Sequence, residues 1–233
     1  MGHVLYRVTV NEEHVEAINI AAGHATAVLC CEMIPLGAYV EGLEHQGDTL
    51  DRITGMLLPF LAREKQDHIS DTVKHLRQVQ RIADLAPLPF WSETITVSSD
   101  KLDAVSQACE MLARLGMWQI ELLLGYVPLE FGEASSVALE SAKQYARAMR
   151  ALHTGMTGVG CSYGIAQKEV PEICKIAFEI HQVIRHRMAW DALAREGKSE
   201  PVFPLVVYDE PIKLTNVPLI KVEPVTRDVR QGG

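Results

Sequence analysis

Four side chains with metal-binding chemistry recur at helical spacing in the second quarter of the chain. They are Glu64, His68, Asp71 and His75. Steps of four, three and four residues place them along one face of a helix. Imidazole and carboxylate groups are ligands for zinc, iron and manganese in proteins. One helix cannot direct all four to a single ion, so a metal site here predicts further ligands from a second helix.

His181 and His186 are the donors that a second helix would offer, since both lie in a long predicted helix. The alternative is a solvated helix face carrying two carboxylate–imidazole pairs. Pairs four residues apart stabilise a helix by roughly 0.2–0.5 kcal/mol each. The surrounding charged residues favour this alternative; they are Lys65, Asp67, Lys74 and Arg77.

A second motif is the run Gly160-Cys161-Ser162-Tyr163-Gly164, which matches the G-x-S-x-G pattern of a nucleophile elbow. That elbow joins a strand to a helix, whereas the segment before Gly160 has a helical pattern. We therefore interpret residues 155–164 as a glycine-rich connector, whose free N–H groups could meet an anion at the following helix. Cys161 is the cysteine we expect to be most exposed. No basic residue adjoins it to lower its pKa, so it is interpreted as a structural thiol.

The segment Met111–Met117 has the outline of a helix-turn-helix centre. A recognition helix needs basic and amide groups, but Trp118–Gly125 contains no Lys or Arg. The net charge of −8 also argues against a duplex nucleic-acid partner. A helix–helix corner is the favoured interpretation. Met111, Met117 and Trp118 could supply either an interface or the core.

The cysteine content indicates a reducing compartment. There are five cysteines, an odd number, and no C-x-x-C pair. We expect no signal peptide, because residues 1–10 lack an apolar run. No apolar run approaches the ~20 residues that a bilayer span needs. The expected localisation is cytoplasmic, with no membrane contact.

The N-terminal third begins with strand character over residues 3–10, where Val4, Tyr6, Val8 and Val10 alternate. Asn11 is a predicted N-cap, and the helix after it is expected to end at Gly23. Residues 25–34 fit either a buried strand or a second helix. The remaining histidines of this region and beyond are interpreted as capping or surface groups; they are His14, His24, His45 and His153.

Helical periodicity dominates the middle of the chain. Apolar residues at helical spacing predict helices from Asp48 to residue 83, with Pro59 as a kink or break, and from Asp100 to Gly116. Ser135 or Ser136 is expected to cap a helix ending at Gly155. The stripe of this helix is Ala138, Ala142, Tyr145, Met149 and Leu152. A central helix is predicted from Pro171 to Gly197, and a short strand over residues 94–97.

Residues 199–233 change character, since they hold five of the eleven prolines between apolar, β-prone pieces. We expect an extended arm that lies against its own core, the N-terminal strand or another chain. Pairing with the N-terminal strand would tie the two chain ends together.

The sequence thus predicts a mainly α (α+β) fold, with a helical bundle-like core and a few short strands from the N-terminal segment and the C-terminal arm. Residues 1–198 are expected to form one helical domain and residues 199–233 the arm. The predicted function is a non-enzymatic interaction or regulatory protein that binds a protein partner or forms a homo-oligomer. The alternative is a helical metal-binding protein or metal-dependent hydrolase that uses Glu64, His68, Asp71 and His75. No cofactor is expected beyond that divalent metal.

Overall fold

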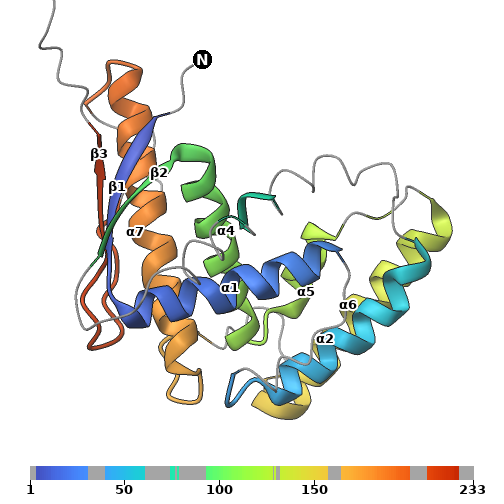
Figure 1. The fold of residues 1–233 in the computed structure, drawn as a ribbon. Helices are drawn as coiled ribbons and strands as arrows, with labels where there is room; N and C mark the ends of the chain where they lie inside the picture. The colour runs from blue at the N-terminus through green and yellow to red at the C-terminus, as the bar shows by residue number, and fades with distance from the viewer. Residues whose placement is uncertain are drawn as a thin grey trace, which may run out of the picture.

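The structure is a computed structural model in which helices dominate and a small sheet lies at one side (Figure 1). It describes residues 4–30, 40–60, 74–76, 78, 93–127, 129, 132–156, 164–199 and 209–225. The helices of these residues are α1 (Glu12–Cys30), α2 (Glu44–Leu57), α4 (Ser99–Gly116), α5 (Ile120–Leu123), α6 (Glu133–Thr154) and α7 (Glu172–Arg195), with 3-10 turns η2 (Leu58–Phe60) and η4 (Leu124–Tyr126). The strands are β1 (Leu5–Val10), β2 (Glu93–Ser98) and β3 (Lys221–Pro224). The predicted fold class, mainly α with a few short strands, is confirmed.

The first helix is longer than the sequence suggests. Asn11 caps it as expected: its side-chain oxygen accepts a hydrogen bond from the His14 N–H at 3.1 Å. The predicted end at Gly23 is wrong, because α1 continues to Cys30. A glycine inside a helix costs about 1 kcal/mol relative to alanine, and here tertiary burial outweighs that cost. Ala21, Ala22 and Ala25 are all buried, which also settles residues 25–30 as helix rather than strand.

Helices α4 and α7 pack closely against each other beside the sheet, and α1 contacts both (Figure 1). The apolar face of α4 is buried as its spacing predicts, with Leu112 and Leu115 fully covered. The end of α4 approaches α7 so closely that a Cβ on Gly116 would lie 2.8 Å from the Cβ and Sγ atoms of Cys174. Gly116 therefore closes the helix, as predicted, and also permits this close approach.

The sheet joins the two ends of the described chain. Its strand order is β2-β1-β3, and both pairs are antiparallel. Val8 of β1 lies opposite Ile95 of β2 and Val222 of β3. The predicted pairing of the N-terminal strand with the C-terminal arm is thereby confirmed. Tyr6, Val8 and Val10 alternate inward and are buried, as expected of a sheet with one face on the core.

Helices α2 and α6 form a second pair beside α1 and α5 (Figure 1). They run antiparallel, since His45 near the start of α2 stacks on His153 near the end of α6. The Arg52 guanidinium also reaches the Tyr145 hydroxyl at 3.4 Å. The predicted start of α2 at Asp48 is four residues late, because the helix begins at Glu44. Among the described helices, none combines the length and the apolar character that crossing a membrane requires.

Met111, Met117 and Trp118 belong to the core, so the alternative that they form a surface is wrong. Trp118 has φ +56°, in the left-handed region that side chains other than glycine rarely adopt. Its ring lies between the core and His153, with the two ring centroids 4.7 Å apart. His45 stacks on the other side of His153, with centroids 4.4 Å apart. These stacked rings connect the α2–α6 pair to the turn after α4.

Candidate interaction surface

Most of the predicted metal stripe lies outside the described part of the chain. Glu64, His68 and Asp71 fall there, so the prediction for them stays a prediction. His75 is described, in a short helical piece, and is half-buried. Within the described residues, no group of three or more His, Cys, Asp or Glu side chains is placed to hold a metal ion.

His181, one of the two proposed second-helix donors, is engaged inside the core. Its Nδ1 atom lies 3.0 Å from the hydroxyl oxygen of Ser106, across the α4–α7 contact. A serine–histidine pair can act as nucleophile and base only where substrate reaches it. Ser106 and His181 are 5% and 6% exposed, and burial lowers the pKa of His181. The pair therefore bridges two helices.

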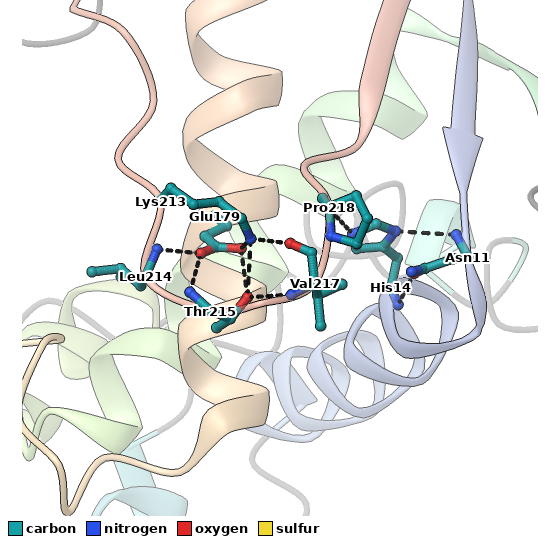
Figure 2. A network of polar contacts seen from close by, with 8 residues as sticks. All are labelled: Asn11, His14, Glu179, Lys213, Leu214, Thr215, Val217 and Pro218. Carbon is teal, nitrogen blue, oxygen red and sulfur yellow. Dashed lines mark hydrogen bonds and ion pairs between the residues drawn. The ribbon is translucent and has the colours of Figure 1, made fainter.

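A buried carboxylate holds the C-terminal arm onto α7. Glu179 is 3% exposed, and its oxygens accept hydrogen bonds from the Thr215 N–H at 2.7 Å and the Thr215 hydroxyl at 3.0 Å (Figure 2). The Leu214 N–H also donates to it, and the Lys213 ammonium lies 3.1 Å away. These hydrogen bonds and the ion pair compensate the cost of burying the carboxylate charge. Glu179 thus serves as an anchor for the arm, a role that local sequence patterns did not predict.

His14 makes a second connection to the arm (Figure 2). The Asn11 N–H donates to its Nδ1 atom at 3.1 Å, so Nδ1 carries no proton. The other ring nitrogen, Nε2, therefore donates to the carbonyl oxygen of Pro218 at 2.7 Å. Asn11 and His14 form a reciprocal cap of the capping-box kind. The expectation that His14 is a capping group is confirmed, and burial lowers its pKa.

The remaining sequence motifs supply no site among the described residues. Ser162 and Cys161 of the G-x-S-x-G run fall outside them. The described elements on either side of that run are helices, α6 and α7, whereas a nucleophile elbow follows a strand. Past the turn at Met117, α5 is a single helical turn that continues into η4. This is a helix–helix corner and not a helix long enough to read a DNA groove.

Helix α6 is the least buried of the long helices that the structure describes. Of its 22 residues only Ser135, Ala142 and Ala146 are buried. The predicted N-cap at Ser135 or Ser136 is three or four residues late: Gly132 is the N-cap and the helix begins at Glu133, and both serine hydroxyls donate back to the carbonyl oxygen of Gly132. The predicted end is confirmed, since Gly155 adopts φ +70° there.

A line of small and apolar side chains, interrupted at its middle by the exposed Gln144, faces solvent on α6, and we call it the α6 stripe. It consists of Ala134, Val137, Ser141, Ala148 and Leu152, all exposed. Val137 is 61% exposed and Leu152 is 73% exposed. At 100° per residue, the five residues fall within roughly 60° of one another, about 120° around the helix from its buried face. The Ser141 hydroxyl donates to the Val137 carbonyl oxygen at 2.9 Å, so this polar group of the stripe is already hydrogen-bonded within the helix.

The predicted packing face of α6 is only partly correct. Ala142 is buried and Tyr145 is half-buried, but Leu152, expected on the same face, is exposed. The seven-residue recurrence of Ala134, Ser141 and Ala148 was the signal for a second face in the sequence. Helical spacing in the sequence shows that a helix has an apolar face, but when two such faces exist it does not show which one packs against the rest of the fold.

Charges along α6 are separated by sign. The first half carries Glu133 and Glu140, with Lys143 at its last position, and the second half carries Arg147 and Arg150. Arg150 forms an ion pair with Glu121 of α5 at 2.6 Å, which attaches α6 to the body. Glu140 and Arg147 border the α6 stripe on the same side and are about half exposed. Along α6, acidic side chains therefore lie toward the start of the helix and basic side chains toward its end.

Comparison of the chain with protein-family models, with curated proteins and with solved structures finds no match.

Proposed function

We propose that this chain is a non-enzymatic interaction protein and that the α6 stripe is its docking surface. One observation carries the proposal: a 22-residue helix buries only three side chains and leaves Val137 and Leu152 in solvent on one face. Burying apolar area yields roughly 25 cal/mol per Å². An exposed line of this kind is a typical place for a partner to bind.

Two further features support the proposal. The polar clusters of the described residues are used within the fold: Glu179 holds the arm, His181 bridges two helices, and His14 caps α1. Within residues 209–225 the arm uses part of its apolar surface inside the fold, since Ile220 and Val222 are buried, while Ile212 is 57% exposed. Among the described long helices, α6 has the fewest buried side chains.

Site-specific photo-crosslinking in cells tests the proposal. A photoreactive amino acid replaces Ser141 or Ala148 in the α6 stripe, and a matched control replaces Lys168, whose side chain is 90% exposed beyond α6. We expect adducts of discrete mass from positions 141 and 148 and none from position 168. We also expect the surface variant Val137→Glu/Leu152→Glu to abolish these adducts while its circular dichroism stays unchanged. Equal labelling at all three positions, or none at any, refutes the proposal.

A further inference from the structure

We propose that the occupant of the α6 stripe is a second copy of this chain, bound antiparallel across a two-fold axis that passes between Gln144 and Tyr145. The inference rests on the proposed function and identifies its partner. The first support is the order of side-chain sizes. Such an axis sets Val137 opposite Leu152 of the second copy, and Ser141 opposite Ala148 of the second copy.

This pairing is self-complementary, as a two-fold interface must be. Gln144 and Tyr145 flank the axis at the edges of the stripe, and Ser141 and Ala148 meet one turn from it, where their small side chains allow the two helices to approach closely. The larger Val137 and Leu152 meet on either side of the axis, where they cover apolar area. All four side chains are exposed in the single chain, so the contact requires no rearrangement of the fold.

The charge order of α6 selects the antiparallel direction. A parallel pair would set acidic half against acidic half and basic half against basic half. An antiparallel pair sets Glu133 and Glu140 toward the half that carries Arg147 and Arg150 in the second copy. Glu140 and Arg147 now lie 3.5 Å apart within one helix and are about half exposed. Each can instead meet its counterpart across the axis, because the offset along the helix is small.

The expected dimer is weak, because each copy contributes one helix. Interfaces below about 1,200 Å² are those of transient complexes, so we expect a dissociation constant on the order of micromolar. Dimer formation should therefore depend on concentration across that range. It should weaken as salt screens the Glu140–Arg147 contacts.

Sedimentation equilibrium of the full chain at low ionic strength measures the association. The expected result is a monomer–dimer equilibrium that Val137→Glu/Leu152→Glu weakens at least tenfold. Glu140→Arg should weaken it roughly fivefold, since two symmetric ion pairs are lost, and adding Arg147→Glu to that variant should restore it. The control variant Lys168→Glu changes charge outside α6, at a side chain that is 90% exposed, and should leave the equilibrium unchanged.

Disulfide cross-linking tests the direction and register. Under mild oxidation, a mixture of Ser141→Cys and Ala148→Cys chains should give a cross-linked heterodimer. Neither variant alone should do so, because identical positions lie about 10 Å apart along the axis of the pair. The wild-type chain, with its five cysteines, gives the background.

Three results would overturn the inference: a monomer throughout the micromolar range, a dimer that Val137→Glu/Leu152→Glu leaves intact, or self-cross-linking of the Ser141→Cys chain alone. These failures are separable from failure of the proposed function. If the wild type is monomeric but photo-crosslinking from position 141 captures a protein of different mass, the docking surface stands and the second copy is refuted. Adducts of twice the chain mass support both.

Discussion

Replacing His24 by leucine should change how the stability of this protein depends on pH. His24 lies in α1 and is 1% exposed. Neither ring nitrogen has a hydrogen-bond partner among the described residues. Burial alone lowers the pKa of His24 to about 4, from an ordinary value of 6.5. The side chain is therefore neutral in the fold at pH 7 and becomes charged more easily once the chain unfolds.

The sign and size of the effect follow from proton linkage. Between about pH 6.5 and pH 4 the unfolded chain binds a proton at this residue and the folded chain does not. The free energy of unfolding therefore falls as pH falls through that window. A difference of about 2.5 pKa units at about 1.4 kcal/mol per unit amounts to roughly 3 kcal/mol at the acidic end. His14 and His181, whose pKa values burial also lowers, add to the same trend in wild type and variant alike.

Urea denaturation of wild type and His24→Leu at about pH 7, pH 5.5 and pH 4.5 measures the difference directly. Near pH 7 the variant should be more stable by about 1–2 kcal/mol, because two unpaired buried polar atoms are removed. The gap should widen by roughly 2–3 kcal/mol toward pH 4.5. Subtracting the two curves cancels the contributions of the other histidines. A gap that stays constant with pH would show that His24 is not buried neutral, and the reasoning would fail.

Three further predictions concern packing, the arm and metal. Gly116→Ala should lower the free energy of unfolding by about 1–3 kcal/mol and lower Tm, because the added Cβ would lie 2.8 Å from Cys174. The control is Gly125→Ala, which should be nearly neutral because nothing lies within 4 Å of its added Cβ. Glu179→Gln should destabilise by about 2 kcal/mol and raise hydrogen exchange at the arm amides that it accepts from; unchanged exchange there would contradict the anchoring role. Elemental analysis of untagged protein tests the metal alternative: a stoichiometric metal that His68→Ala removes would support it, and a metal-free wild type would end it.

The sequence predicted which helices and strands form better than it predicted the residues at which they begin and end. The inward alternation of Tyr6, Val8 and Val10 identified β1, and apolar spacing identified α4 and α7. Helix ends were less certain because local signals compete with burial. Gly23 is a good helix terminator by itself, yet α1 passes through it because the alanines around it are buried on both sides.

The anchoring contacts were beyond sequence reasoning for a different reason. Glu179 meets Thr215, 36 residues further along the chain, and no local pattern records that meeting. The exposed α6 stripe was similarly hidden, because a helix with two candidate faces gives no sign of which one the neighbours will cover. Long-range contacts decide both cases, and these are what the structure adds.

The strand order β2-β1-β3 has a consequence for the protein during its synthesis. β1 leaves the ribosome before β2 and β3, yet it is the middle strand between the other two. Until Val222 emerges to pair with Val8, one edge of β1 stays open and its backbone hydrogen-bonding groups are available to other chains. Contacts this distant in sequence also form slowly. The nascent chain therefore passes through a stage in which the helices before β3 can form while β1 still lacks β3, and chaperone binding to β1 should be strongest then.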